Sequence, residues 1–181
     1  MRRNTPNILV AGTPGVGKSL MSRILSEKTG LEWLDVSKIA IENECVVEYD
    51  DVYQTDLVDE EMLLEGVLDS LMDEGGKIVD FHSADFFPKI WFDIVFVLRT
   101  DNIILYDRLK ERGYCGEKLE YNITCEISET ILEEARSYYR TEIVYELISN
   151  TLDQVTDNVN IICQWLEQWK IDNQHMEIDN Q

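Results

Sequence analysis

The sequence predicts an α/β protein in which a parallel sheet carries helices on both faces. Apolar runs of strand length alternate with segments of helical periodicity along the 181 residues. The run Ile94–Leu98 is apolar at every position, which is typical of a strand buried on both faces. The first apolar run, residues 7–11, leads into a glycine-rich loop that opens a helix. Parallel sheets use such loops to bind ligands at the carboxyl ends of their strands.

The expected strands are short apolar runs bounded by polar residues or glycine, and they cover residues 7–11, 31–35, 78–82, 93–99 and 143–147. The expected helices have apolar spacing near 3.6 residues and end at signals such as Gly30 and Gly75-Gly76. They cover residues 17–28, a stretch from 37, residues 58–73 and 101–112, a long helix through 123–138, and a last helix through 155–169.

The segments between these elements set the expected domain organisation. Residues 48–56 are rich in Tyr and Asp and predict a loop, and residues 86–92 form an aromatic connector that we expect to pack in the core. Residues 113–120 predict a short polar loop, and the chain from Lys170 predicts disorder. We expect one domain over residues 1–170, acting as a monomer, and a polar tail over 171–181. Residues 36–66 and 113–120 stand where a phosphate-transfer enzyme carries its acceptor-binding arm and its lid.

The glycine-rich loop carries the strongest functional signal. Residues 12–19 match the phosphate-loop pattern G-x-x-x-x-G-K-[ST] at every fixed position, between a strand and a helix. The glycines let backbone N–H groups surround phosphate oxygens, Lys18 can reach the β- and γ-phosphates, and the Ser19 hydroxyl can ligate Mg²⁺. We therefore expect a nucleoside triphosphate to bind, with Mg²⁺, at Gly12, Pro14, Gly15, Val16, Gly17, Lys18, Ser19 and Leu20.

Two polar residues end the strand predicted over residues 78–82. Asp80 is the candidate for the second acid of the nucleotide site, where a carboxylate holds the Mg²⁺ shell directly or through water. The alternative for Asp80 is a helix cap or a turn. His82 would lie on the same side as Asp80 if the strand continued, and a neutral imidazole there could orient an attacking water. The alternative for His82 is a structural hydrogen bond.

Arg108 and Arg112 lie four residues apart on one helix face, directly before the predicted lid. Arginines at a lid hinge can clamp phosphates bidentately or stack on adenine. A solvated helix face explains the same spacing equally well. With Lys18, Asp80 and His82, Arg112 completes the set of candidate catalytic residues.

Charge and cysteine usage limit the classes of partner. The net charge is -20, with 36 acidic and 16 basic residues, so a broad nucleic-acid-binding surface is disfavoured. From Ile39 to Gly76 there is no lysine or arginine, whereas thirteen residues are Asp or Glu. The acidity serves either solubility alone or a basic protein partner. The four cysteines lack metal-ligand or redox spacing, and the chain shows no signal peptide, membrane span or lipidation motif. We expect a soluble intracellular protein.

Several motifs together carry a resemblance to a known family. They are residues 12–19, 79–82, 85–88, 96–100, 108–109, 112–114, 122–123, 125–127 and 165–169. In this combination the chain resembles the atypical adenylate kinase isoenzyme 6 family, the coilin-interacting nuclear ATPases involved in small ribosomal subunit maturation. The family's Asp-x-His pattern falls on Asp80 and His82, and the resemblance favours a catalytic role for His82.

The resemblance implies a nucleoside-monophosphate-kinase fold with adenylate kinase and ATPase activity. It implies Mg²⁺ with ATP as the phosphoryl donor, AMP as the acceptor and ADP as the product. It also implies a location in nucleus and cytoplasm, a role in processing the ribosomal RNA precursor, and a basic small-subunit ribosomal protein as partner. Adenylate kinases carry an arginine for the acceptor phosphate on the arm helix, at the position of Ile41 here. This departure predicts that AMP phosphorylation is affected more than ATP binding.

Two rival functions use the same loop chemistry. The first is a nucleotide-gated assembly factor in which ATP changes the affinity for a basic ribosomal protein, with little AMP phosphorylation. The second is a small-molecule kinase that is unrelated to ribosomes and has a different acceptor.

Overall fold

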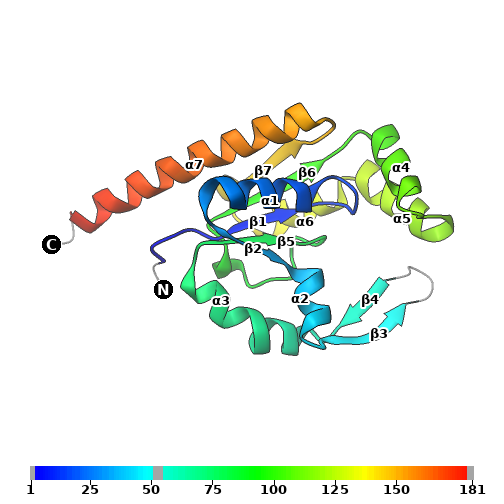
Figure 1. Ribbon diagram of the computed structural model, residues 1–181, viewed down its shortest axis with the longest axis horizontal. Helices are drawn as coiled ribbons and strands as arrows, with labels where there is room; N and C mark the ends of the chain where they lie inside the picture. The colour runs from blue at the N-terminus through cyan, green and yellow to red at the C-terminus, as the bar shows by residue number, and fades with distance from the viewer. Residues whose placement is uncertain (1–2, 51–54, 179–181) are drawn as a thin grey trace.

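The computed structural model describes residues 3–50 and 55–178, with the backbone alone at residue 55 and residues 174–178. Five parallel strands form the main sheet of this part of the chain, in the spatial order β2-β5-β1-β6-β7. In chain order they are β1 (Ile8–Ala11), β2 (Glu32–Asp35), β5 (Lys77–Asp80), β6 (Ile94–Arg99) and β7 (Val144–Ile148). Figure 1 shows this sheet between layers of helices, so the predicted fold class is confirmed.

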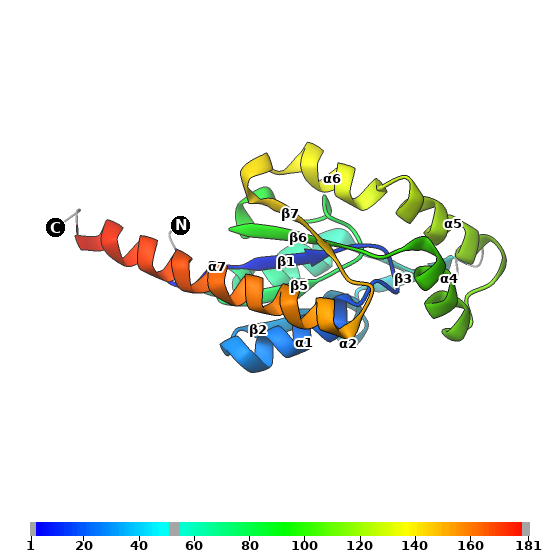
Figure 2. The ribbon, with the colours of Figure 1, turned by 90° about the horizontal axis from the view of Figure 1, so that it is seen from above.

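Each face of the sheet has its own apolar core. One cluster lies against α1 (Lys18–Thr29) and α7 (Leu152–Ile178), and the other lies against α2 (Val36–Glu42), η1 (Met62–Leu68), α3 (Asp69–Glu74) and α6 (Thr130–Tyr138). Figure 2 shows α1 and α6 on opposite sides of the strands. Successive residues of β1 alternate between the clusters, with Ile8 and Val10 in one and Leu9 and Ala11 in the other. This double burial explains why the strands read as unbroken apolar runs.

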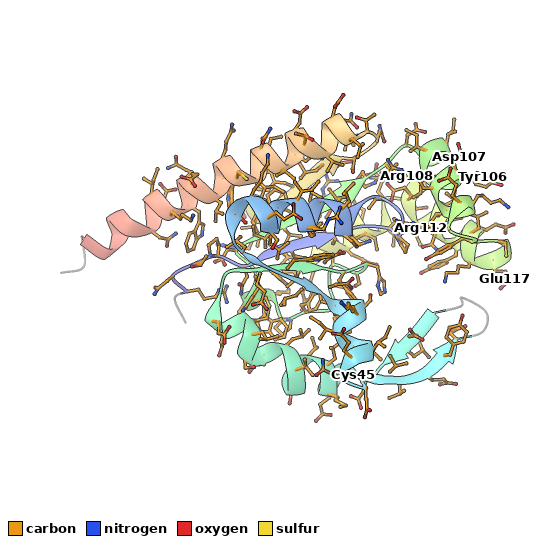
Figure 3. All side chains as sticks on the ribbon, viewed as in Figure 1. Cys45, Tyr106, Asp107, Arg108, Arg112 and Glu117 are labelled. Carbon is orange, nitrogen blue, oxygen red and sulfur yellow. The ribbon has the colours of Figure 1, made fainter. Side chains whose placement is uncertain are left out.

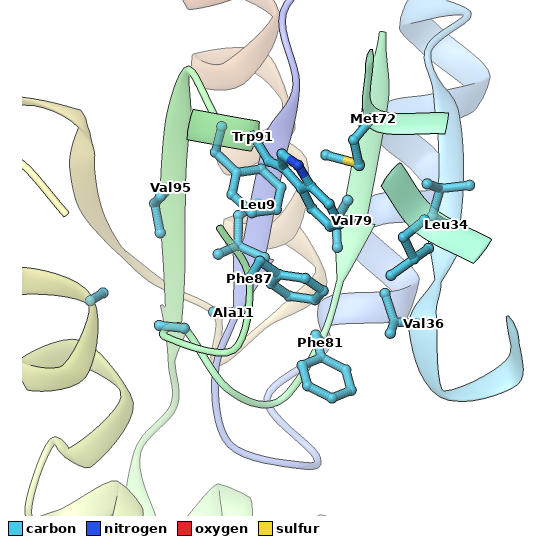
Figure 4. Close-up of a cluster of buried hydrophobic side chains, with 14 of the residues drawn as sticks. Leu9, Ala11, Leu34, Val36, Met72, Val79, Phe81, Phe87, Trp91 and Val95 are labelled. Carbon is cyan, nitrogen blue, oxygen red and sulfur yellow. The ribbon is translucent and has the colours of Figure 1, made fainter. Parts of the chain in front are cut away.

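The aromatic connector between β5 and β6 packs as predicted. Phe87, Trp91 and Phe92 are each at most 5% exposed, and Phe87 makes edge-to-face contacts with Phe81 and Phe92. The 3-10 helix η2 (Lys89–Trp91) lies within this connector. Figure 4 shows Phe87 and Trp91 beside Leu9, Val79 and Val95, which come from β1, β5 and β6, in the core on this face of the sheet.

The carboxyl ends of the strands meet at one end of the molecule. β1 continues into the phosphate loop there, and the helices α4 (Asn102–Glu111) and α5 (Gly116–Ile127) follow β6 at the same end. Figure 1 places α4 and α5 on one side of this end and the hairpin of β3 (Val46–Asp50) and β4 (Thr55–Val58) on the other. The arrangement forms a cleft with the sheet as its floor.

The predicted loop over residues 48–56 is wrong. The structure has an antiparallel hairpin of β3 (Val46–Asp50) and β4 (Thr55–Val58), with Tyr49 opposite Asp56; residues 51–54 lie outside the described part of the chain. The sequence obscures these strands because acidic residues interrupt the β-branched and aromatic ones. Val47 and Tyr49 remain more than half exposed, so the usual alternation between core and solvent is missing.

The predicted regular helix over residues 58–73 is also corrected. The helix begins at Glu60, is π-helical over η1 (Met62–Leu68) and continues as α3 to Glu74. The N–H of Asp69 donates to the carbonyl of Leu64, five residues back. The wider turn buries both Leu63 and Leu68, which are five residues apart, and leaves Met62 exposed.

Three further boundaries differ from the prediction. α5 begins at Gly116, so most of the expected loop over residues 113–120 is helix. The expected long helix is broken between α5 and α6, where Glu129 has φ 55°, a left-handed conformation that a continuous helix excludes. α7 runs to Ile178, beyond the point where disorder was expected from Lys170. A short 3-10 helix, η3 (Thr141–Ile143), precedes β7.

Among the described residues, no helix combines the length and apolar character that a membrane crossing requires.

Candidate functional site

A cleft of about 990 Å³ opens at the carboxyl ends of the strands. The phosphate loop and the ends of β2 and β5 form its floor, α5 and the end of α4 form one wall, and α2 with the β3–β4 hairpin forms the other. Of the predicted site residues, the cleft is lined by Pro14, Gly15, Gly17, Lys18, Ser19, Leu20, Asp80, His82 and Arg112. Residues far apart in the sequence thus meet in one place. The predicted residues that do not line it are Gly12, Val16 and Arg108.

Backbone geometry explains the glycines of the loop. Gly12 has φ 144°, and a Cβ there would lie 2.7 Å from the carbonyl oxygen of Leu98 on β6. Gly15 and Gly17 have φ 93° and 103°, which also favour glycine. Val16 faces inward, with its side chain fully buried in the core against α1, so its contribution to phosphate binding would come from its backbone. α1 begins at Lys18 and directs its unpaired N–H groups and positive dipole end toward the loop.

Lys18 is buried at the floor of the cleft. Its Nζ donates to the carbonyl oxygens of Gly12 at 2.8 Å and Thr13 at 3.2 Å. Burial lowers the pKa of Lys18 to about 8, against the opposing effect of the Asp80 carboxylate and with a contribution from Arg112. The loop thus holds an ammonium group that is poorly compensated for its burial, and a phosphate would stabilise it.

Asp80 ends β5 and is 5% exposed. Its Oδ2 atom is buried without a hydrogen-bond partner among the described residues. Burial raises the pKa of Asp80, the charge of Lys18 opposes that rise, and the charge of Asp35 on the adjacent strand adds to it. An unpartnered carboxylate oxygen on the same cleft floor as the Ser19 hydroxyl fits a Mg²⁺ ion.

The donor set favours an ion that arrives with its ligand. Within the described residues, no group of three or more His, Cys, Asp or Glu side chains could hold a metal ion. Mg²⁺ is commonly bound by one or two carboxylates together with water and substrate phosphates. Ser19 and Asp80 therefore fit Mg²⁺ as part of a nucleotide complex.

His82 lies just after the sheet, because β5 ends at Asp80 rather than at residue 82. The N–H of Phe81 donates to the carbonyl of Val10 and makes the last contact with β1. The His82 ring is open to the cleft, yet the cleft walls exclude enough water to lower its pKa to about 4, with help from the Lys18 charge. The imidazole is therefore neutral near pH 7, which is the form that can accept a proton from water or an acceptor hydroxyl.

The two predicted arginines behave differently, although both lie on the side of α4 toward the sheet (Figure 3). Arg108 donates to the carbonyls of Gly15 at 3.4 Å, Ser149 at 3.1 Å and Asn150 at 2.7 Å. These hydrogen bonds link the phosphate loop to the turn between β7 and α7. Arg112 lines the cleft and is exposed, and its side chain has no hydrogen bond or ion pair with another described residue. Arg112 is the arginine that is available to a bound phosphate.

Sequence reasoning missed two carboxylates of the site. Asp35 ends β2 directly beside Asp80, lines the cleft, and accepts a hydrogen bond from the N–H of Lys38 as the cap of α2. Its position at the polar end of a strand was a usable signal, because the same reasoning identified Asp80. Glu126 is 1% exposed and accepts a hydrogen bond from Thr13 in the phosphate loop. Only the tertiary fold brings Glu126 next to Thr13.

The wall opposite α5 has a different character. It is acidic and apolar, and it is lined by Ala40, Val46, Tyr49, Asp50, Asp56, Leu57, Val58 and Glu60. No lysine or arginine occurs in this part of the sequence. Ile41 is 59% exposed on α2 and lies outside the residues that line the cleft.

Comparison with known proteins places these features in a family. A family model described as an AAA domain matches residues 8–129. The chain is 47% identical to an adenylate kinase isoenzyme 6 homolog of Drosophila melanogaster, over 91% of this chain and 94% of the relative. It is 45% identical to the homolog of Caenorhabditis elegans, over 96% and 94% of the two chains.

Solved structures share the fold at much lower identity. A gluconokinase from Sinorhizobium meliloti has a TM-score of 0.58 and 16% identity, covering 94% of this chain and 99% of that chain. A shikimate kinase from Acinetobacter baumannii has a TM-score of 0.57 and 19% identity, covering 92% and 95%. These structures support the phosphate-loop kinase fold, and the sequence relatives show the family more narrowly. The chain belongs to the adenylate kinase isoenzyme 6 homolog family.

Proposed function

We propose that the chain is a Mg-ATP-dependent phosphotransferase that transfers a phosphoryl group from ATP to AMP and also hydrolyses ATP. The observation that carries the proposal is the meeting of Lys18, Ser19, Asp80 and Arg112 around one phosphate loop. Phosphoryl transfer needs little covalent chemistry from the protein, so positioning and charge stabilisation are sufficient. The names of the relatives support AMP as the acceptor.

Each residue has a role that its surroundings support. Lys18 would leave the carbonyls of Gly12 and Thr13 and bind the β- and γ-phosphates. Ser19 and Asp80 would hold Mg²⁺, which neutralises charge on the phosphates when bound. Arg112 would stabilise the transferred group from the α4 side, and neutral His82 would position water or the acceptor hydroxyl. Arg112 and the walls of the cleft would exclude bulk water.

Replacement of Lys18 with Ala tests this proposal. We expect turnover to fall by at least about 100-fold, because the residue touches the charge that develops during transfer. Circular dichroism and thermal unfolding would show that the variant is folded. Lys110→Ala, an exposed lysine on α4, serves as the control and should keep full activity. Unchanged turnover in folded Lys18→Ala would overturn the assignment.

A second function is favoured by the acidic wall and by the exposed side chains of Val47, Tyr49 and Leu57 on the hairpin. The chain would act as a nucleotide-gated assembly factor for a basic small-subunit ribosomal protein, as the family resemblance implies. ATP would bring the arm and lid together and so change the affinity for that partner. The absence of lysine and arginine from Ile39 to Gly76 supports this function, because such a segment suits a basic polypeptide better than a phosphate.

Binding of a purified basic ribosomal protein should then be compared with and without Mg-ATP. A change in dissociation constant of at least about fivefold is expected for coupled sites. Lys18→Ala should abolish the change while leaving nucleotide-free binding intact. Equal affinity with and without nucleotide would remove the gating hypothesis but leave the enzymatic proposal untouched.

A further inference from the structure

Glu126 is a buried carboxylate that the proposed chemistry does not use. It lies in the last turn of α5 and is 1% exposed. A carboxylate beneath a loop that binds anionic phosphates would oppose binding unless its charge were compensated. Arg99 at the end of β6 provides that compensation, with its Nε 2.7 Å from Glu126 Oε1.

Hydrogen bonds satisfy both carboxylate oxygens of Glu126. Oε1 accepts from Arg99 and from the backbone N–H of Thr100 at 3.0 Å. Oε2 accepts from the hydroxyl of Thr13 at 2.6 Å. Arg99 also donates from Nη2 to the Glu126 carbonyl at 2.9 Å. Charge-assisted bonds of this kind are short and strong; those from Thr13 and Thr100 are buried here, and those from Arg99 are partly buried.

Thr13 connects this network to the binding site. It is 2% exposed within the phosphate loop, and its carbonyl accepts from Lys18 Nζ at 3.2 Å. Fixing the Thr13 side chain therefore restrains the loop segment that holds Lys18 in place. A loop ordered before binding loses less conformational entropy when the ligand arrives.

The helix that carries Glu126 also faces the cleft. Its cleft-lining residues are Lys118, Tyr121, Asn122 and Cys125. Their spacing of three, one and three residues places them on one stripe of α5, and Glu126 follows directly. One residue thus joins the cleft-facing helix, the phosphate loop and the end of β6.

We propose that Glu126 is a positioning residue that holds the phosphate loop and the cleft-facing stripe of α5 in one arrangement for binding the phosphates of ATP. The contact that matters is the hydrogen bond from Thr13. The inference rests on the proposed binding of Mg-ATP, so binding by the unaltered protein is measured first. Absence of that binding would count against the proposed function, whereas the comparisons below count for or against the role of Glu126.

The test removes the hydroxyl and keeps the shape. Thr13→Val should raise the KM and the calorimetric dissociation constant for Mg-ATP about tenfold, while kcat changes less than threefold. Thr13→Ser keeps the donor and should stay within twofold of the unaltered protein on both measures. Thr29→Val is the matched control, because its hydroxyl also donates at 2.7 Å, to the Leu25 carbonyl, but lies outside the residues that line the cleft. It should bind Mg-ATP normally.

A Glu126→Met background tests whether the hydroxyl acts through Glu126, because methionine has a similar length and no oxygen to accept from Thr13. In that background, Thr13→Val should weaken Mg-ATP binding by less than a further twofold. A full tenfold loss there would show that the hydroxyl acts without Glu126 and would overturn the proposal. So would normal binding by Thr13→Val, or a tenfold loss in Thr13→Ser. If Glu126→Met does not fold, these last two outcomes still test the proposal.

Discussion

Lys18 is the residue where function and stability oppose each other. Its ammonium group is buried, and two neutral carbonyls are its hydrogen-bond acceptors in the described structure. Its pKa is about 8 in the folded chain and 10.5 in the unfolded chain, so the unfolded chain binds more protons between these values. The cost to stability is therefore full below pH 8 and disappears as pH rises toward 10.5. The pKa difference corresponds to about 3 kcal/mol.

Replacing Lys18 with Met should consequently stabilise the free protein at pH 7. The two carbonyls left without a donor would cancel about 1–2 kcal/mol of the gain, so we expect the melting temperature to rise by about 2–6 °C. Thermal unfolding at pH 7 and pH 10 measures the effect, and the rise should shrink at pH 10. Lys110→Met, at an exposed position, should change little at either pH. A less stable Lys18→Met protein at pH 7 would contradict this account.

His82 offers a second test at the residue scale. Its pKa of about 4 predicts that the imidazole stays neutral from pH 5.5 to 7.5. NMR titration of the ring signals, assigned with His82→Asn, measures this directly. Because the folded-state pKa of about 4 lies below the ordinary value of 6.5, His82 makes folding less favourable as pH falls from about 6.5 toward 4. A measured pKa near 6.5 would mean that the ring is fully hydrated in the cleft.

At the scale of elements, the π-helical geometry of η1 predicts which side chains at the start of this helix are buried. Leu63 is fully buried, whereas Met62 is 44% exposed. Leu63→Ala should cost about 2–5 kcal/mol of unfolding free energy, because it opens a cavity in the core. Met62→Ala should cost less than about 1 kcal/mol. Urea denaturation measures both, and equal losses would show that the helix has a different phase.

The elements that the sequence predicted correctly are those whose pattern follows from burial on two faces. β1 and β6 read as apolar runs because alternate residues enter different cores. The hairpin was missed because Val47 and Tyr49 face solvent between acidic residues, which leaves no alternating pattern. The break between α5 and α6 was missed because Glu129 adopts φ 55° in a sequence without glycine or proline. The main-chain conformation there is set by packing.

The same distinction holds for the site. Local spacing identified Lys18, Ser19 and Asp80, since Asp80 lies at the carboxyl end of a strand and the other two begin the helix that follows the phosphate loop. Spacing left open how Arg108 and Arg112 differ, because the contacts of Arg108 depend on the β7–α7 turn, which lies 41 to 42 positions further along the chain. The link between Thr13 and Glu126 spans 113 positions and has no local pattern.

At the scale of the whole molecule, charge divides the cleft into two sides. Lys18 and Arg112 lie on the nucleotide side. On the arm side, the described residues that line the cleft include Asp50, Asp56 and Glu60 and no lysine or arginine, because Lys38 on α2 lies outside them. A phosphate acceptor in the cleft would therefore meet carboxylates on the arm side and cations only on the opposite side. This distribution of charge favours binding of ATP at the phosphate loop and disfavours binding of the AMP phosphate at the arm.

Ile41→Arg tests the role of the arm. Ile41 is 59% exposed on α2, so an arginine can be added without opening the core. A cation there should lower the KM for AMP about tenfold through a charge-assisted contact and leave the KM for ATP unchanged. Ile41→Gln is the matched control, because it adds polarity without charge. If Arg and Gln give the same KM for AMP, the arm does not meet the acceptor phosphate.

The central claim is that this cleft transfers a phosphoryl group from Mg-ATP to AMP and also hydrolyses ATP. It is tested most directly by following ATP consumption with purified protein, with and without AMP, while ADP and released phosphate are resolved separately. We expect ADP formation to increase with AMP and to exceed the phosphate released, and we expect phosphate release without AMP to be slower than ADP formation with AMP. We also expect both products to be lost in Lys18→Ala. Phosphate release that is indifferent to AMP, with no additional ADP, would contradict the kinase assignment.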